Sequence, residues 1–199
     1  GRGGRTGIVP AMTDTFAGKR VLVTGAASGI GRAVALRLAA DGAVLFLTDV
    51  NPEGLGATVE AARAAGAEVA EYRALDITDY DAVAGFGADI HTRHLAMDAV
   101  MNVAGVSVWG TVDQLTHRQW RAMVDVNLMG PIRLTRHLLP PMFEARAGKI
   151  VNVASDAGRV GSLGETVYSA AKGGLIAFTK GLAREAARYG ITVNCVCPG

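Results

Sequence analysis

Tyr168 and Lys172 are the two residues whose types and spacing point most directly to chemistry. They lie four residues apart in a segment of helical period, so both side chains project from one face of a helix. A free phenol has a pKa near ~10, and a close ammonium in a poorly hydrated cleft stabilises the phenolate by about 4 kcal/mol, which brings that pKa toward neutrality. The pair is therefore a candidate acid and base.

Ser155 is a third candidate, because it follows an apolar run that reads as a strand. Its hydroxyl can donate a hydrogen bond to a substrate carbonyl oxygen where negative charge develops. Each residue alone also has an ordinary structural interpretation, with Tyr168 and Lys172 as solvated helix residues and Ser155 as a turn or cap residue. The combination of all three favours a catalytic centre.

A glycine-rich turn lies near the other end of the chain. The segment Thr24 to Gly31 reads TGAASGIG, directly after an apolar run and at the start of a helical pattern. The amides and dipole of a helix N-terminus suit an anionic pyrophosphate, and glycines let the backbone approach it closely. The spacing departs from the common GxGxxG fingerprint, and a glycine cluster alone can be only a tight turn.

Asp49 supports the dinucleotide interpretation, since it ends the next apolar run, about twenty residues further on. An acid in that position can accept hydrogen bonds from the adenosine ribose hydroxyls. Taken alone, it can also be read as a helix cap. A 2′-phosphate there would meet a like charge, at a cost of about 4 kcal/mol before screening. Arg32 is the only nearby cation that could offset this cost, so the sequence predicts NAD rather than NADP.

The elements that must position these residues alternate along the chain. Six short β-branched runs predict strands at 20–24, 43–48, 69–75, 98–102, 149–154 and 192–196. Apolar residues three and four apart predict helices in the segments 29–40, 52–65, 116–139 and 167–189. Near-continuous apolar strands joined by helices predict an α/β fold with a doubly wound parallel sheet, whose ligand crevice lies at the strand C-termini.

Composition narrows the function classes. The 199 residues are half hydrophobic and carry 20 Lys and Arg against 18 Asp and Glu, so we expect one domain and no nucleic-acid partner. No apolar run approaches the ~20 residues of a membrane span, which predicts no membrane partner and a cytoplasmic protein. Cys195 and Cys197 read as buried reduced thiols, and the four histidines show no metal spacing, so no metal is expected.

Together these motifs resemble the short-chain dehydrogenase/reductase family, over residues 16–199. The resemblance includes the TGxxxGxG loop, the acid at Asp49, Pro198-Gly199, and the motifs Asp76-Ile77, Asn102-Val103-Ala104-Gly105, Asn127, Ser155 and Tyr168 with Lys172. Val103 departs from the pattern, because it stands where the family's NNAG motif has its second Asn. That change removes no catalytic group.

The resemblance implies a catalytic tetrad of Asn127, Ser155, Tyr168 and Lys172. Tyr168 would exchange a proton with the substrate oxygen as hydride moves to or from the nicotinamide, while Ser155 polarises that oxygen. Lys172 would also hold the nicotinamide ribose, and Asn127 a water. The implied cofactor contacts come from Gly25, Ser28, Gly29, Ile30, Gly31, Asp49, Asp76, Ile77, Asn102, Gly105, Tyr168 and Lys172.

We therefore expect a Rossmann-fold oxidoreductase that moves hydride between NAD(H) and a small-molecule secondary alcohol or ketone. The stretch 154–178 resembles hydroxyacyl-CoA dehydrogenases, which adds a hydroxyacyl-CoA as one possible substrate. A 3-oxoacyl carrier-protein reductase and a catalytically inactive nucleotide-binding fragment remain the alternatives. The apolar content of 116–139 and 167–189 predicts a homodimer or homotetramer through these helices.

Two further expectations concern the ends of the chain. Residues 1–15 are expected to be a disordered leader, and residues 16–199 one dinucleotide-binding and catalytic domain. In the family, a last strand and a substrate lid follow the segment that matches Pro198-Gly199, so we expect the domain to be incomplete at its C-terminus. Poor turnover with retained cofactor binding would follow.

Overall fold

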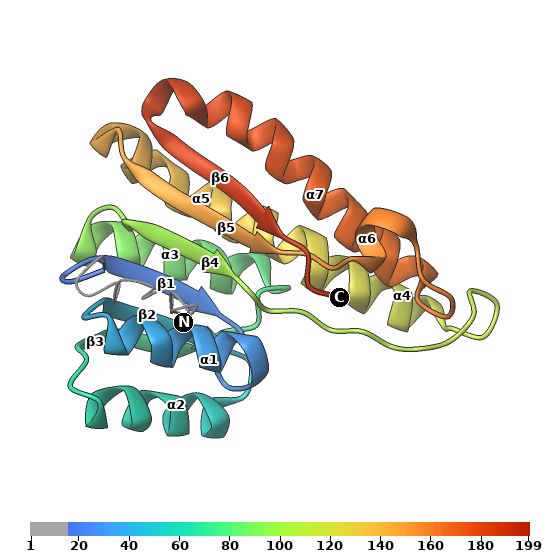
Figure 1. Ribbon diagram of the computed structural model, residues 1–199, viewed down its shortest axis with the longest axis horizontal. Helices are drawn as coiled ribbons and strands as arrows, with labels where there is room; N and C mark the ends of the chain where they lie inside the picture. The colour runs from blue at the N-terminus through green and yellow to red at the C-terminus, as the bar shows by residue number, and fades with distance from the viewer. Residues whose placement is uncertain (1–15) are drawn as a thin grey trace, which may run out of the picture.

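The computed structural model describes residues 16–199, and the expected leader over 1–15 lies outside the described residues. The described chain forms one six-stranded sheet in the order β3-β2-β1-β4-β5-β6, with parallel pairings throughout (Figure 1). The strands are β1 (Arg20–Thr24), β2 (Val44–Asp49), β3 (Val69–Ala74), β4 (Ala99–Asn102), β5 (Gly148–Val153) and β6 (Ile191–Val196). The predicted doubly wound α/β class is confirmed, with strand ends displaced by one residue at most.

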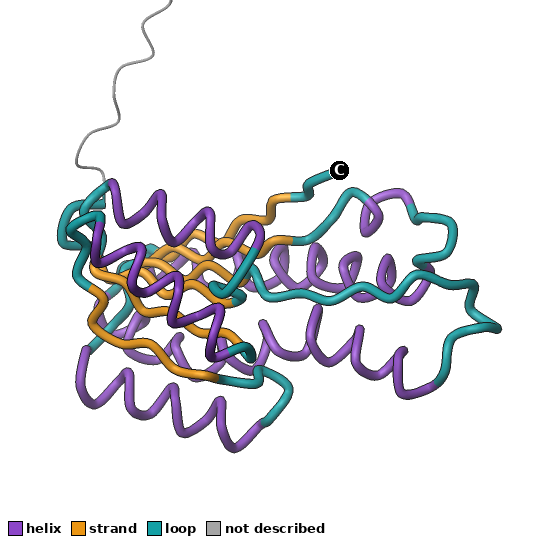
Figure 2. Tube along the Cα trace, turned by 90° about the horizontal axis from the view of Figure 1, so that it is seen from below, coloured by secondary structure: helices purple, strands orange, loops and turns teal. Residues whose placement is uncertain are grey.

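Helices cover both faces of this sheet, above and below the strands in Figure 2. They are α1 (Gly29–Ala40), α2 (Pro52–Ala64), α3 (Tyr80–His94), α4 (His117–Val124), α5 (Gly130–Ala145), α6 (Ala157–Val160) and α7 (Thr166–Ala186). A π-helical turn, η1 (Asp125–Met129), joins α4 to α5, and a 3₁₀ turn, η2 (Ala187–Tyr189), follows α7.

β1 contributes side chains to two hydrophobic cores, one on each face of the sheet. Side chains alternate along a strand, so Val21 and Val23 point to one face and Leu22 to the other. Val21 and Val23 pack in a cluster with residues of α1 and α2, whereas Leu22 packs in a cluster with residues of α3, α5 and α7. The sheet is therefore buried on both faces, as the apolar strands predict.

Two helical segments differ from the prediction. The helix expected over 116–139 is interrupted by η1 and continues through Pro140 and Pro141 as far as Ala145. A proline inside a helix costs about 3 kcal/mol, and here the burial of Leu138, Pro141 and Met142 offsets that cost. The prediction did not include α3, although its signals are present in the sequence. Asp79 caps it, and Val83, Phe86 and Ile90 form its buried face.

Candidate active site

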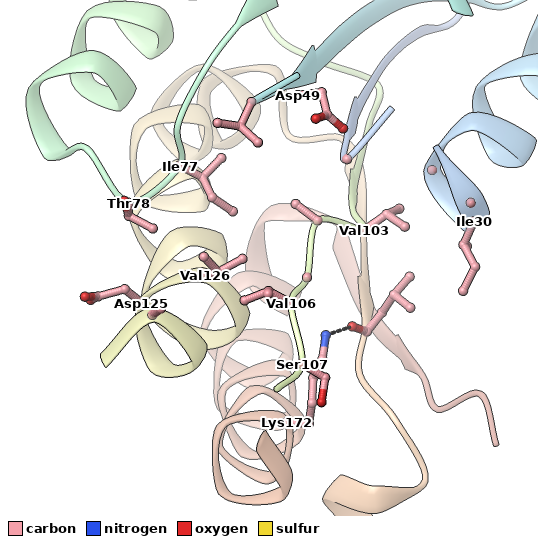
Figure 3. Close-up of a pocket in the computed structure, with 18 of the residues that line it drawn as sticks. Ile30, Asp49, Ile77, Thr78, Val103, Val106, Ser107, Asp125, Val126 and Lys172 are labelled. Carbon is pink, nitrogen blue, oxygen red and sulfur yellow. Dashed lines mark hydrogen bonds between the residues drawn. The ribbon is translucent and has the colours of Figure 1, made fainter. Parts of the chain in front are cut away.

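A cavity of about 1020 Å³ lies where the strands end. It is lined from both halves of the chain, and Figure 3 shows Asp49 near one end of the view and Lys172 near the other. The sequence-predicted residues that line it are Gly25, Ser28, Gly29, Ile30, Gly31, Asp49, Asp76, Ile77, Gly105, Ser155, Tyr168 and Lys172. The fold thus brings the glycine-rich turn and the Tyr-Lys pair into one cavity.

The turn between β1 and α1 is shaped by glycines. Gly25 and Gly29 have φ angles of +69° and +52°, which other residues rarely adopt. A Cβ on Gly31 would collide with the Gly25 carbonyl, and a Cβ on Gly25 would lie 2.8 Å from the Cα of Ala104. The backbone of the turn is therefore packed directly on the start of α1 and on the loop after β4.

The N-terminus of α1 fits a dinucleotide phosphate. Ser28 is the N-cap, and its side chain makes no capping hydrogen bond within residues 16–199. The amides of a first helical turn have no partner within their own helix, and residues 28–31 line the cavity. Amides in this position, combined with the helix dipole, suit an anionic pyrophosphate.

Asp49 is held rigidly at the end of β2. Its Oδ2 accepts from the Ala27 amide and its Oδ1 from the Asn51 amide, each at 2.9 Å. The side chain lies between the glycine turn and the loop that begins α2, and it lines the cavity. Two backbone donors fix the carboxylate, so its negative charge faces any group bound in this part of the cavity.

Lys172 and Tyr168 meet on one face of α7. Lys172 is 3% exposed, and its Nζ donates to the Val153 carbonyl at 2.7 Å, the dashed line in Figure 3. The same Nζ lies 5.8 Å from the centroid of the Tyr168 ring. Burial lowers the pKa of Lys172 to about 8, because the ammonium has lost most of its water.

Ser155 follows β5 on a loop that is fixed on both sides. The amides of its neighbours Ala154 and Asp156 donate to the carbonyls of Val196 and Pro198, both at 2.8 Å. Its Oγ accepts from the Ala157 amide at 3.2 Å. The hydroxyl proton is therefore available for an acceptor in the cavity.

Asn127 lies behind the cavity wall, in the π-helical turn. Its Nδ2 donates to the carbonyls of Val106 at 2.6 Å and Met123 at 2.8 Å, and its Oδ1 accepts from the Val106 amide at 3.2 Å. A Cβ on Gly105 would lie 2.9 Å from the Asn127 Oδ1 and 3.4 Å from the Lys172 Nζ. Asn127 and Lys172 therefore converge on the backbone of Gly105.

Asn102 differs in position from the other implied cofactor contacts. It is buried in the sheet, and its Nδ2 donates to Asn152 Oδ1 at 2.8 Å and to Thr135 Oγ1 at 3.3 Å. It lies outside the set of described residues that line the cavity. Both partners of its Nδ2 lie inside the core, and its Oδ1 has no hydrogen-bond partner among the described residues.

Several features of the site have no signal in the amino-acid sequence. Arg118 and Arg121 of α4 line the cavity, and the Val153 carbonyl anchors Lys172. Both depend on contacts between segments far apart in the chain. Within residues 16–199, no helix is long and apolar enough to cross a membrane, and no group of three or more His, Cys, Asp or Glu is placed to hold a metal ion.

Comparison with known proteins agrees with this architecture. The model of the short chain dehydrogenase family matches residues 19–199. The 3-oxoacyl-[acyl-carrier-protein] reductase FabG of Thermotoga maritima is 37% identical over 182 residues, which cover 92% of this chain and 74% of that protein.

Two solved structures are similar over most of the chain. NAD⁺-bound xylitol dehydrogenase has a TM-score of 0.88 at 33% identity, and the match covers 93% of this chain and 71% of that one. A variant of actinorhodin polyketide ketoreductase with NADPH has a TM-score of 0.87 at 39% identity, with coverage of 92% and 70%.

Proposed function

This chain belongs to the short chain dehydrogenase family of oxidoreductases, and we propose that it transfers a hydride between NAD(H) and a secondary alcohol or its ketone. One observation carries the proposal: Ser155, Tyr168 and Lys172 line the same cavity as a glycine-shaped helix N-terminus. The first group provides proton transfer and the second an anion site, which is the combination that this reaction needs.

Each residue of the chemical end would have a distinct task. When bound, the nicotinamide ring would supply or accept the hydride. Tyr168 would give a proton to the substrate oxygen or take one from it, supported by the Lys172 ammonium beside its ring. Because the pKa of Lys172 is about 8, this lysine is mostly charged at neutral pH. Ser155 would donate its free hydroxyl proton to the same oxygen, and Asn127 would hold the wall at Val106.

Asp49 supports NAD as the cofactor. Its carboxylate is fixed by the amides of Ala27 and Asn51, so it cannot turn away from a 2′-phosphate without losing both hydrogen bonds. The similar solved structures include both an NAD⁺ and an NADPH complex, so the comparisons leave both cofactors open. Titration of NADH and NADPH at fixed salt tests the choice, and equal affinity or tighter NADPH would overturn it.

A 3-oxoacyl thioester is the second candidate substrate, since one relative is named a 3-oxoacyl carrier-protein reductase. The hydroxyacyl-CoA suggested by the stretch 154–178 belongs to the same chemical class. Parallel assays with acetoacetyl-CoA and with a simple cyclic ketone distinguish a thioester substrate from a general ketone. A much higher kcat/KM with acetoacetyl-CoA favours the thioester, and equal values favour a general ketone.

We further propose a homodimer or homotetramer formed through α4, α5 and α7. Three large apolar side chains in this part of the chain pack against the core but stay partly exposed: Phe143 of α5, Phe178 of α7 and Tyr189 of η2. Light scattering at micromolar concentration tests the assembly, and a monomer would contradict it.

A further inference from the structure

Cys195 and Cys197 lie together at the edge of the active site, outside the machinery described above. Cys195 is in β6 opposite Asn152, and Cys197 is the first residue after that strand. The hydrogen bonds to the carbonyls of Val196 and Pro198 continue the extended pairing past the end of β6, so both thiols leave the chain on the same side. Both are free and partly exposed. Burial raises the pKa of the Cys195 thiol, and the neighbouring Cys197 thiol raises it further. The chain has no other cysteine.

The backbone around these thiols is tied to the catalytic residues. The carbonyls of Val196 and Pro198 accept from the amides on either side of Ser155. Val196 also pairs in register with Val153, whose carbonyl holds the Lys172 Nζ. Both thiols lie within electrostatic range of Lys172, and Pro198 and Gly199 line the cavity. A change in the backbone between Cys195 and Pro198 therefore acts on Ser155 and Lys172 together.

We propose that Cys195 and Cys197 form a dithiol site for trivalent arsenicals, and that its occupation inactivates the active site by displacing the 195–198 backbone. The location of the site rests on the two thiols alone. The inactivation also rests on the proposed oxidoreductase function.

The spacing favours an arsenic bridge over a disulfide. Residues two apart on a strand are separated by about 6.6 Å between Cα atoms, at the upper limit of about 6.8 Å for a direct S–S bond. One arsenic atom between the sulfurs spans a wider gap than a direct bond does. An arsenoso compound R–As=O reacts with two thiols to form two As–S bonds and one water. Arsenic stays trivalent, and the two thiol protons leave in the water.

Phenylarsine oxide is the probe for this site. We expect mass spectrometry of the intact protein to show one phenylarsenic group that survives a glutathione wash and is removed by dithiothreitol. Cys195→Ser and Cys197→Ser each retain one thiol, so their adducts should be lost in the glutathione wash. An absent adduct in the natural chain, or a wash-resistant adduct in either variant, would overturn the site.

The inactivation is measured separately. With an active ketone or alcohol substrate, the adduct should lower turnover at least tenfold and dithiothreitol should restore it, while both serine variants should resist the probe. Hydrogen exchange at the Ala154 and Asp156 amides reports the displacement even if no substrate is turned over, and we expect faster exchange in the adduct. Unchanged exchange would refute the coupling and leave the proposed function untouched. Absent NADH binding before modification would refute the proposed function and leave the dithiol site intact.

Discussion

The two ends of the cavity are built by different means. At the cofactor end, backbone atoms form the wall, and Gly25 and Gly31 leave no room for a Cβ. At the chemical end, the side chains of Ser155, Tyr168 and Lys172 supply the functional groups. Ser155 accepts a hydrogen bond from a backbone amide, and Lys172 donates one to a backbone carbonyl. The first end thus depends on shape and the second on functional groups.

This difference has a consequence for substitutions. Adding one carbon at the cofactor end should damage binding and stability together, because the wall itself must move. Removing one polar group at the chemical end should abolish chemistry while the fold and cofactor binding persist. Four substitutions test this contrast, two on each side.

Tyr168→Phe should have the largest effect. It removes only the hydroxyl that exchanges the proton, so in a C-terminally complete version turnover should fall by about 10³-fold, within the range for general acid and base groups. NADH affinity and the melting temperature should stay close to those of the natural protein. Steady-state rates and cofactor titration measure both. Tyr72→Phe, at a half-exposed position of β3, is the control and should leave turnover unchanged. Full turnover in Tyr168→Phe would refute the proposed mechanism.

Gly31→Ala should weaken NADH binding by about 100-fold and destabilise the fold by about 1 to 3 kcal/mol, because its Cβ meets the Gly25 carbonyl. Calorimetric titration and denaturant unfolding measure the two effects. Gly56→Ala is the matched control, since Gly56 lies inside α2 and a Cβ there meets no described atom within 4 Å. It should raise stability by up to about 1 kcal/mol and leave binding unchanged. Similar behaviour of both variants would remove the contrast between the two ends.

Lys172→Met should stabilise the fold while destroying activity. The pKa of Lys172 is lowered from 10.5 to about 8, so below pH 8 the folded protein buries a charge that the unfolded chain leaves in water. Between pH 8 and 10.5 the unfolded chain binds the extra proton, so stability of the natural protein rises with pH in this window.

We therefore expect a gain of roughly 2 kcal/mol for Lys172→Met at pH 7, which shrinks as the pH approaches 10.5. Urea unfolding at several pH values measures it. Lys180→Met, on an exposed position of the same helix, should show no such pH dependence. A gain that is constant with pH would show that burial of the charge is not its source.

Asp49→Asn should have the smallest effect of the four. Removing the charge should shift the ratio of NADPH to NADH affinity by about tenfold in favour of NADPH, since the carboxylate is partly exposed and water screens it. Parallel fluorescence titrations measure the ratio, and Asp81→Asn at the exposed start of α3 is the control. An unchanged ratio would mean that Asp49 does not face the ribose.

Local patterns were sufficient to predict the sheet and the glycine-rich turn that lines part of the cavity. The apolar runs located the strand ends to within one residue. The turn at Gly25 to Gly31 was found because the residues that form it are consecutive in the sequence. Other features depend on partners distant in sequence. Asn102 is directed by Asn152, fifty residues away, and Lys172 by a backbone carbonyl that has no sequence signature.

The turn η1 illustrates the same limit. Asn127 was identified from its motif, but the π-helical geometry around it was not predicted. Its side-chain amide donates to the Met123 carbonyl and also exchanges hydrogen bonds with the backbone of Val106. The contact with Val106 forms only after the loop that follows β4 has folded against the helix. Helical period alone carries no information about that loop.

The central position of β1 has a consequence for the order of folding. One edge of β1 pairs with β2, which follows it closely in the sequence. The other edge pairs with β4, where Val21 is opposite Ala99. During synthesis, the segment from β1 to β3 therefore leaves the ribosome with an apolar strand edge unpaired until β4 has emerged. Pairs so distant in sequence form slowly. The nascent chain is thus open to misassembly while the strands that complete the catalytic cavity are still being translated.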